Sequence, residues 1–301
     1  MSRYDRQISL PEIGTEGQAR LKAAHVLVVG AGGLGATVLP LLAGAGVGQI
    51  TLLDPDRIEE SNLHRQILYR MEDLGRAKAV VAAESLARLN PDCRISGRVE
   101  RAHPANVADL AEGVDLVIDA ADNFAVSYAL SDFCFAMGLP LITASVLGRS
   151  GYAGGLCGGG PSLRALFPDL PGIAQTCATG GVMGPAVATL VAIQAQMALS
   201  VLLGQAPSPL GQIVQCDLAT WRLSGFRFDG ASEQAGPAIL AASQIKNDDQ
   251  LFDLRHSDTP PKIGHGRRAV FLCSTGLRAW RAARAAMDDG HQNVAVIGDG
   301  A

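Results

Sequence analysis

Residues 24–54 contain the feature that most restricts the fold, an apolar run joined directly to a glycine-rich loop. Ala24-His-Val-Leu-Val-Val-Gly30 is the kind of β-branched run found in strands that are covered on both faces. It leads into Gly30-Ala-Gly-Gly-Leu-Gly35, then a helical pattern over residues 36–45 and a second apolar run. The second run ends in Asp54, about 20 residues after the glycines, which is the spacing of a nucleotide-binding βαβ unit.

Strands and helices continue to alternate after this unit. Residues 76–89 show a helical pattern, and the apolar runs at 114–119 and 140–144 are typical of buried strands. Residues 212–217 and 221–228 read as antiparallel strands. We therefore expect an α/β fold with a Rossmann-like, doubly wound, mostly parallel sheet that carries an antiparallel extension.

The character of the sequence changes past Gly204, and the small-residue stretch at residues 229–247 predicts a domain boundary. We assign residues 1–230 to a nucleotide-binding domain and the small-residue stretch 231–248 to a linker. Residues 249–301 then form a small α/β tail, close to the lower size limit for an independent core.

Composition excludes several classes of protein. With 25 basic and 29 acidic residues the formal net charge is −4, so no basic surface for nucleic acid is expected. An apolar fraction of 48% argues against disorder. The six cysteines form no CxxC pair and no apolar signal opens the chain, which favours a reducing cytoplasm.

Residues 182–204 are almost entirely apolar and long enough to span a membrane. The run contains Pro185, Gln194 and Gln196, however, and no flanking Lys or Arg. We interpret it as a buried helix, in the core or at a subunit interface, and expect no membrane contact.

The glycine loop by itself does not identify a ligand. Gly30, Gly32, Gly33 and Gly35 let the backbone approach a phosphate at the start of a helix, which suits NAD, FAD, S-adenosylmethionine or ATP alike. A tight turn without a ligand has the same pattern. Asp54 is placed to hold a ribose hydroxyl.

The residues after Asp54 favour a triphosphate. Asn62, Arg65, Gln66 and Lys78 follow the ribose position closely, and Ser61 begins the same segment. A redox cofactor needs no such cluster, whereas a triphosphate that loses pyrophosphate does, because charge builds on the leaving group. Arg65 or Lys78 taken alone reads equally well as part of a solvated helix face.

Two polar residues follow the strand that ends at Asp119. The Asp122 carboxylate is placed to hold Mg²⁺ at the carboxyl end of the sheet, and Asn123 is a further candidate contact for the nucleotide.

In combination, these motifs resemble the adenylating enzymes of the ThiF/MoeB/HesA family, bacterial relatives of ubiquitin-activating enzymes. The resemblance covers about residues 3 to 228 and is highly specific. The matching pieces are Arg3-Tyr-Asp-Arg-Gln-Ile8, Gly30 to Gly35, Ser61 to Gln66, Lys78, Ala121-Asp-Asn123, Pro140-Leu-Ile-Thr-Ala144 and Thr176-Cys-Ala-Thr-Gly-Gly-Val-Met-Gly-Pro185.

The resemblance implies an enzyme that uses Mg-ATP to activate the C-terminal glycine of a ubiquitin-like sulfur carrier ending in Gly-Gly. It implies that Asp54 holds the ribose, that Asn62, Arg65 and Lys78 contact the phosphates, and that Asp122 binds magnesium. Arg6 would reach the ATP of a partner subunit, so a homodimer is implied. The carrier would serve thiamine or molybdopterin synthesis, with sulfur from a cysteine desulfurase or a sulfurtransferase.

Cys177 is the candidate thiol for the step after activation. It stands shortly before the helix expected from Val182, and a helix N-terminus favours a thiolate. A single cysteine is more often a buried core residue than a reactive thiol. The assignment of Cys177 therefore depends on the surrounding family motif.

The sequence departs from the family at its zinc site. Many members bind a structural zinc through two CxxC pairs, but here Ser162 and Ala165 stand where the first pair would be. No second pair follows Phe228, and Zn²⁺ needs about four such ligands. We therefore expect no structural zinc, and a segment Pro161 to Thr176 that is held by packing alone.

The tail resembles a rhodanese-type sulfurtransferase domain. Cys273-Ser-Thr-Gly-Leu-Arg278 precedes a helix, an arrangement that stabilises a thiolate or persulfide, so Cys273 is a candidate persulfide carrier. The segment between Arg255 and Ala269 is shorter than in the full domain. An active and a vestigial domain both remain open.

Other functions also remain open from the sequence. An NAD-dependent oxidoreductase needs only the glycine loop and Asp54, although Arg65, Lys78 and Asp122 then have no role in hydride transfer. A non-catalytic dimeric scaffold of the same fold is a further alternative, as is the related dehydratase that modifies a tRNA base. The sequence leaves open which carrier, and hence which pathway, is served.

Overall fold

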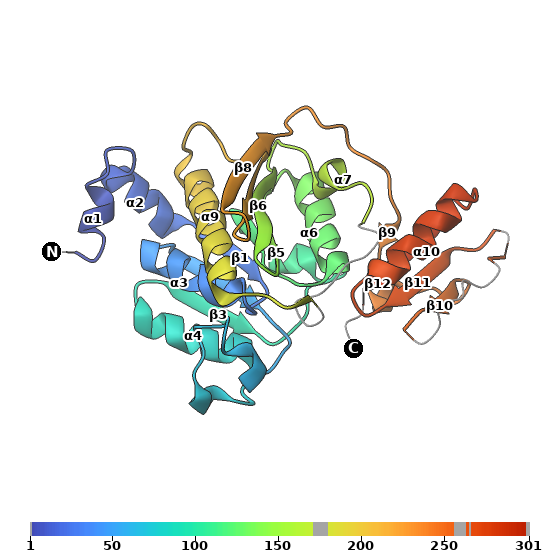
Figure 1. Cartoon of the computed structure of the whole chain (residues 1–301), viewed down its shortest axis with the longest axis horizontal. Helices are drawn as coiled ribbons and strands as arrows, with labels where there is room; N and C mark the ends of the chain where they lie inside the picture. The colour runs from blue at the N-terminus through green and yellow to red at the C-terminus, as the bar shows by residue number, and fades with distance from the viewer. Residues whose placement is uncertain (1, 171–179, 256–262, 265, 299–301) are drawn as a thin grey trace.

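The computed structural model describes residues 2–170, 180–255, 263–264 and 266–298, which build two units around separate sheets (Figure 1). The large sheet has the strand order β3-β2-β1-β4-β5-β6-β7-β8. Its strands are β1 (His25–Val29), β2 (Gln49–Leu53), β3 (Arg94–Arg98), β4 (Leu116–Asp119), β5 (Pro140–Leu147), β6 (Ser150–Cys157), β7 (Gln212–Asp217) and β8 (Arg222–Arg227).

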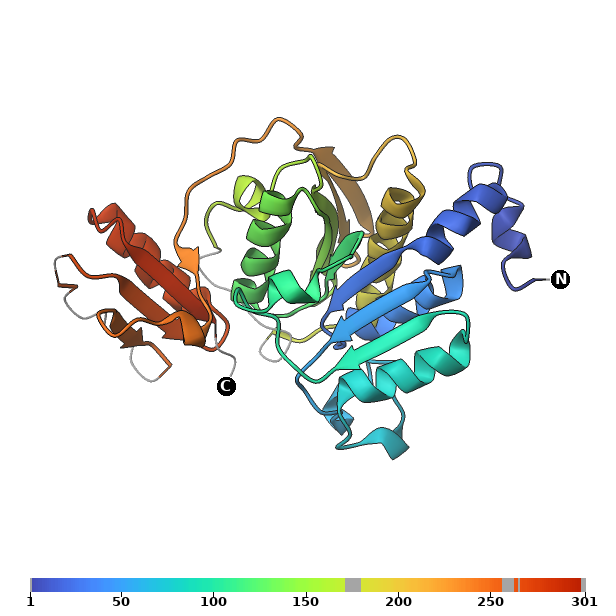
Figure 2. The same ribbon diagram turned by 180° about the vertical axis from the view of Figure 1, so that it is seen from behind.

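Helices cover both faces of this sheet (Figure 2). The helices of this unit are α1 (Asp5–Ile8), α2 (Gly14–Ala23), α3 (Gly35–Ala45), α4 (Lys78–Leu89), α5 (Val107–Leu110), α6 (Phe124–Met137), α7 (Leu163–Leu166) and α9 (Gly184–Leu203), with 3-10 turns η1 (Glu60–Asn62) and η2 (Met71–Asp73). Of these, α1 and α2 lie at one end of the sheet rather than on a face. The expected α/β fold, a doubly wound and mostly parallel sheet with an antiparallel extension, is confirmed.

The strand order reverses beside β1. This strand pairs in parallel with β2 on one side and with β4 on the other, while β6, β7 and β8 are antiparallel additions beyond β5. In open α/β sheets such a reversal opens a crevice at the carboxyl ends of the strands, where ligands bind. The loops after β1, β2 and β4 therefore outline the candidate site.

Alternate residues of β1 contribute to two separate cores. Val26 and Val28 pack with α3, α4 and α9, whereas Leu27 and Val29 pack with α5 and α6 on the other face. All four are buried. A strand enclosed in this way needs apolar side chains on both sides, which explains the continuous run in the sequence.

The apolar run over residues 182–204 forms α9, which packs against α3, β5 and β6. In the part of the chain that is described, α9 alone has the length and hydropathy of a membrane span. Half of its apolar stretch is buried within the protein. Gln194 is buried at its centre and donates hydrogen bonds from Nε2 to the carbonyl oxygens of Asp119 and Ile142, at 2.9 and 3.3 Å. A core helix was one of the two environments expected for this segment.

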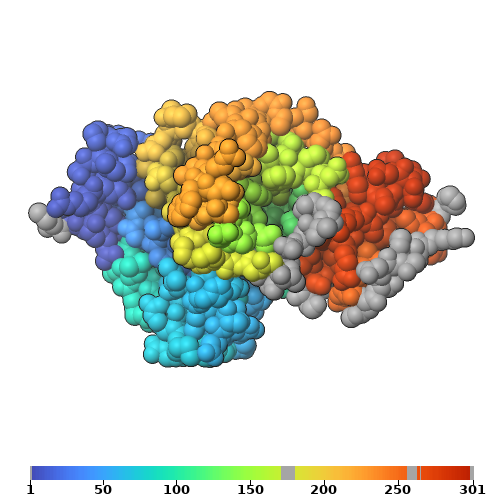
Figure 3. All heavy atoms as spheres, in the orientation of Figure 1, coloured from blue at the N-terminus to red at the C-terminus, as the bar shows by residue number. Residues whose placement is uncertain are grey.

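The C-terminal unit has a parallel sheet in the order β10-β11-β12-β9. Its elements are β9 (Ala238–Ile239), η3 (Ala242–Gln244), β10 (Gln250–Asp253), β11 (Ala269–Cys273), α10 (Leu277–Asp288) and β12 (Val294–Gly298). The segment 231–248, expected as a linker, thus supplies the edge strand β9 and so belongs partly to this sheet. The C-terminal unit and the helices α1 and α2 form opposite ends of the molecule (Figure 3).

Candidate active site

The glycine loop after β1 lies tightly against the carboxyl end of β4. Gly30 has a φ of 101°, and a Cβ there would collide with the carbonyl oxygen of Ala120. A Cβ on Gly35 would collide with the carbonyl oxygen of Gly30. The Tyr69 hydroxyl fixes the loop by donating a hydrogen bond to the carbonyl oxygen of Ala31 at 2.7 Å.

Asp54 follows β2 and is bound to the same loop. Its Oδ2 accepts a hydrogen bond from the backbone N–H of Ala31 at 2.7 Å, and its Oδ1 accepts one from Asp56 at 2.8 Å. Burial raises the pKa of Asp54, and the nearby Lys78 charge opposes that rise. Each carboxylate oxygen keeps acceptor capacity that a ribose hydroxyl can use.

Lys78, the first residue of α4, lies next to the two acidic residues Asp54 and Asp56 that follow β2. Only 5% of Lys78 is exposed, and its Nζ donates to Asp56 Oδ2 at 2.9 Å. Arg65 lies over Gly33, where a Cβ would be 3.6 Å from the arginine Cγ and Cδ. Two cations from separate segments therefore border the glycine loop, an arrangement suited to a polyphosphate.

The turn η1 places two further predicted residues beside Arg65. The arginine Nη1 donates to the carbonyl oxygen of Ser61 at 3.3 Å, and Asn62 Nδ2 donates to the Ser61 hydroxyl at 3.1 Å. Gln66 is buried with its Nε2 near Gly32, and within the described ranges its Oε1 has no hydrogen-bond partner. The space over Gly32 and Gly33, which side chains at those positions would fill, fits a phosphate chain.

The loop after β4 places Asp122 and Asn123 at the same edge. Asp122 is exposed, and its carboxylate has no hydrogen bond to any described residue, so both oxygens are available to a cation. No group of three His, Cys, Asp or Glu side chains gathers in the described segments. Mg²⁺ commonly uses one or two carboxylates together with substrate phosphates, so this donor set fits it.

Asp119 holds the start of that loop in place through hydrogen bonds. It is fully buried at the end of β4, accepts a hydrogen bond from the Thr143 hydroxyl at 2.9 Å, and accepts another from the backbone N–H of Ala121 at 3.2 Å. Burial raises the pKa of this carboxyl group.

Arg6 lies away from this site within its own chain. Helix α1 packs at the end of α3 that is remote from the glycine loop, where Gln7 Nε2 donates to the carbonyl oxygen of Ala45 at 2.9 Å. A Cβ on Gly46 would be 2.7 Å from the Tyr4 ring. Helix α3 spans about 16 Å at its usual rise per residue, so Arg6 and the loop are at opposite edges of the sheet.

Cys177 lies outside the described residues. The chain returns to the site just after it, because a Cβ on Gly184 at the start of α9 would be 2.6 Å from the His64 carbonyl oxygen. All five cysteines among the described residues are buried, and burial raises the pKa of Cys93 to about 11 and that of Cys157 to about 12. Such thiols are poor nucleophiles at neutral pH.

Cys273 ends β11 and is buried. Its Sγ accepts a hydrogen bond from the backbone N–H of Ala279, in the first turn of α10, at 3.3 Å. Arg278 Nη2 donates to the carbonyl oxygen of Arg255 at 3.3 Å. The helix N-terminus expected beside this thiol is therefore present, but its sulfur is closed off from solvent.

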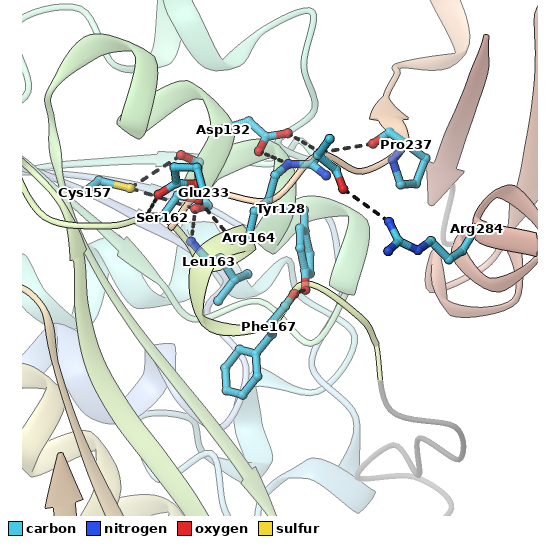
Figure 4. A network of polar contacts seen from close by, with 12 residues as sticks. Tyr128, Asp132, Cys157, Ser162, Leu163, Arg164, Phe167, Glu233, Pro237 and Arg284 are labelled. Carbon is cyan, nitrogen blue, oxygen red and sulfur yellow. Dashed lines mark hydrogen bonds and ion pairs between the residues drawn. The ribbon is translucent and has the colours of Figure 1, made fainter. Parts of the chain in front are cut away.

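Ser162, which stands in place of one cysteine of the first zinc-binding pair, belongs to a network of polar contacts (Figure 4). Ser162 donates to the Glu233 carboxylate from its backbone N–H at 2.7 Å and from its hydroxyl at 2.5 Å. Arg164 makes two hydrogen bonds to Asp132, at 2.6 and 2.7 Å, and one to the carbonyl oxygen of Pro237 at 3.0 Å. The expectation that packing alone holds this segment is therefore wrong for residues 161–170.

Sequence reasoning assigned no role to three residues that shape the site. Asp56 binds Lys78, Tyr69 fixes the glycine loop, and Asp119 supports the loop that carries Asp122. Asp56 stands two residues after Asp54, and this spacing was the one available signal. Tyr69 reads as an ordinary apolar residue, because only the fold brings its hydroxyl to Ala31.

Comparisons with known proteins show which family the chain resembles. The ThiF family model matches residues 4–236 of the chain. The sulfur carrier protein adenylyltransferase of Thermus thermophilus is 42% identical over 225 residues, covering 72% of this chain and 83% of that relative. The SAMP-activating enzyme E1 of Haloferax volcanii is 40% identical over 219 residues, covering 72% of this chain and 81% of that relative.

A two-function relative and a solved structure extend the comparison. The probable adenylyltransferase/sulfurtransferase MoeZ of Mycobacterium tuberculosis is 38% identical over 224 residues, which cover 72% of this chain but 57% of MoeZ. The crystal structure of E. coli MccB has a TM-score of 0.67 at 22% identity, covering 78% of this chain and 70% of MccB, which shows a common fold. From the family match and its close relatives, the chain belongs to the ThiF family.

Proposed function

We propose that this protein is an adenylyltransferase that uses ATP to activate the C-terminal glycine of a ubiquitin-like sulfur carrier protein. The relatives named above include an adenylyltransferase that acts on a sulfur carrier protein. The observation that carries the proposal is the position of Lys78 and Arg65 beside the glycine loop, with Asp54 bound to the same loop. Hydride transfer offers no role for these two cations, which disfavours an oxidoreductase.

The reaction requires positioning and charge neutralisation more than proton transfer. A carboxylate oxygen of the carrier's terminal glycine attacks the α-phosphorus of ATP, the bond to the β-phosphate oxygen breaks, and pyrophosphate leaves. The attacking carboxylate is already ionised, so no general base is needed. Asp54 orients the ribose, while Asn62, Arg65 and Lys78 hold the phosphates as negative charge shifts onto pyrophosphate.

The exposed Asp122 carboxylate is our candidate ligand for Mg²⁺, with Ser61 and Asn123 near the nucleotide. The ion, when bound, neutralises charge on the phosphates. The glycine loop, Gly30 to Gly35, would approach the phosphates with its backbone N–H groups.

A homodimer completes the site in this proposal. Within one chain, Arg6 is at the sheet edge opposite the glycine loop, so it can reach a nucleotide only in another copy. A symmetric dimer would give each of its two sites one Arg6 from the partner.

Sulfur transfer follows activation. The Cys177 thiol is the candidate nucleophile that displaces AMP from the activated glycine, and Cys273 is a candidate persulfide carrier. Sulfur would come from a cysteine desulfurase or a sulfurtransferase, for thiamine or molybdopterin synthesis. We place this chemistry in the cytoplasm, where ATP and reduced thiols are both present.

Carrier-dependent ATP–pyrophosphate exchange tests the first step. We expect label to pass from pyrophosphate into ATP only when a carrier ending in Gly-Gly is added. Cys177→Ala should leave this exchange intact and block only the later sulfur transfer. A folded protein that shows no exchange with any cognate carrier would contradict the proposal, and loss of exchange in Cys177→Ala would contradict the division of steps.

A further inference from the structure

The carboxyl ends of the strands of the C-terminal sheet face the carboxyl end of the large sheet. In a parallel α/β unit, ligands bind at the carboxyl ends of the strands. The carboxyl ends of β11 and β12, with Ser274 just beyond β11 and Gly298 closing β12, lie against the first turn of α6. That turn directly follows Asp122, so the C-terminal unit borders the loop proposed to hold Mg²⁺.

Two glycines allow this close approach. A Cβ on Gly298 would collide with the Cβ of Ala125 in α6, and its distance to Asn123 Oδ1 would be 3.0 Å. A Cβ on Gly276, which has a φ of 84°, would be 2.8 Å from the same Ala125 atom. The contact therefore depends on the absence of side chains at both positions.

The contact continues along α6. The rings of Trp280 in α10 and Tyr128 in α6 have centroids 4.5 Å apart, and the Arg164 guanidinium lies 5.4 Å from the Trp280 ring centroid. Arg284 Nε, also from α10, forms an ion pair with Asp169 at 3.2 Å. Trp280 is buried as part of the core on this face of the large sheet, so the C-terminal unit is firmly docked.

Asn123 joins the two edges. Only 6% of it is exposed, and its Oδ1 accepts a hydrogen bond from the Val126 N–H at 3.2 Å, which caps α6. Its Nδ2 donates to the carbonyl oxygen of Ser274 at 3.1 Å and, more weakly, to that of Gly298 at 3.5 Å. Both ends of the amide are therefore in use, and it has no donor left for a nucleotide in this arrangement.

We infer that the docked C-terminal unit, acting through Asn123, positions the Asp122 carboxylate of the adenylating site. Asn123 is then a positioning residue. The C-terminal unit would then contribute structurally to adenylylation, whether or not it also transfers sulfur. This inference rests on the function proposed above.

The test compares Gly298→Ala with Gly230→Ala, both in a Trp221→Phe background. Gly298→Ala introduces the collision with Ala125, whereas a Cβ on Gly230 meets nothing within 4 Å. The chain has two tryptophans and Trp221 is 83% exposed, so its removal leaves Trp280 emission as a direct report on docking. Pyrophosphate exchange is then measured against Mg²⁺ concentration.

We expect Gly298→Ala to shift Trp280 emission to the red and to raise the Mg²⁺ concentration for half-maximal exchange about tenfold, the effect of losing one well-placed hydrogen bond. The rate at saturating Mg²⁺ should change much less. Gly230→Ala should match the parent in both measurements. A red-shifted Gly298→Ala protein with an unchanged Mg²⁺ requirement would overturn the inference.

Asn123→Ser provides a second measurement if Gly298→Ala does not fold. Serine keeps a cap for α6 but is too short to reach Ser274. A raised Mg²⁺ requirement supports the inference, and an unchanged one rejects it. Absence of exchange in the parent protein itself would count against the proposed function, so the two failures are distinguishable.

Discussion

The Lys78 ammonium group donates a hydrogen bond to Asp56 Oδ2 across 2.9 Å at the rim of the glycine loop. The two partners differ in environment, because the lysine side chain is 6% exposed and the aspartate side chain 59% exposed. The exposed carboxylate can turn toward water when a phosphate arrives, whereas the buried ammonium stays in place. The pair thus keeps a cation ready for the phosphates.

Loss of either phosphate-facing cation should abolish measurable exchange. Lys78→Ala and Arg65→Ala each remove positive charge from the leaving pyrophosphate, and one such contact is worth roughly 100-fold or more in rate. Lys22→Ala is the matched control, since Lys22 is exposed on α2. Initial rates of carrier-dependent exchange provide the measurement. A Lys78→Ala enzyme within threefold of the parent rate would mean that the lysine has a structural role only.

Arg6 should act on the partner's nucleotide, which subunit mixing can show. Arg6→Ala and Arg65→Ala proteins should each be inactive alone. After random subunit exchange, half of the dimers are mixed and each mixed dimer has one intact site, so about a quarter of the parent activity should return. No recovery after mixing, with subunit exchange verified by mass spectrometry, would show that Arg6 does not act across a dimer.

The Ser162–Glu233 contact should stabilise residues 161–170 without a metal ion. Glu233→Gln weakens a charged acceptor of two hydrogen bonds and should lower the free energy of unfolding by about 1 kcal/mol. The exposed neighbour Gln234→Ala is the control. Urea unfolding measures both, and a chelator should leave the parent curve unchanged. One tightly bound zinc per chain in metal analysis would refute the expectation.

Asp119 should make stability depend on pH. Its folded pKa is raised by burial above the ordinary 3.8, so its stabilising contribution is complete at low pH and is lost as pH rises through the folded pKa. Between the two pKa values the slope is about 1.4 kcal/mol per pH unit. Asp119→Asn should remove this slope in urea unfolding followed from pH 4 to pH 8, while the exposed Asp109→Asn keeps it. Parallel pH curves for Asp119→Asn and the parent would disprove the assignment.

The sequence predicted those elements whose signals are local. The strand expected over residues 212–217 is β7 with the same bounds, and Asp54 directly follows β2 as the spacing requires. Strand β6 was not anticipated, because its sequence Ser-Gly-Tyr-Ala-Gly-Gly-Leu-Cys reads as a loop. Pairing with β5 and β7 makes it a strand, and a Cβ on Gly155 would collide with the Pro209 carbonyl oxygen.

The same distinction applies to the site. The glycine loop and Asp54 lie within one contiguous unit, so spacing alone brings them together. The Ser162–Glu233 and Asn123–Ser274 contacts join residues 71 and 151 positions apart, and no periodic pattern encodes such a meeting. Both contacts therefore depend on the tertiary fold and have no local sequence signal.

The contacts of Glu233 and Trp280 also determine where this chain can be shortened. A fragment ending at residue 230 would keep Ser162 without its acceptor and would leave the Tyr128 face of α6 bare. Newly exposed apolar surface of this kind promotes aggregation. A fragment ending with the family match at residue 236 would keep Glu233 but still lack Trp280. The unit that folds together therefore extends beyond the residues matched by the family model. Expression trials should retain the whole C-terminal sheet.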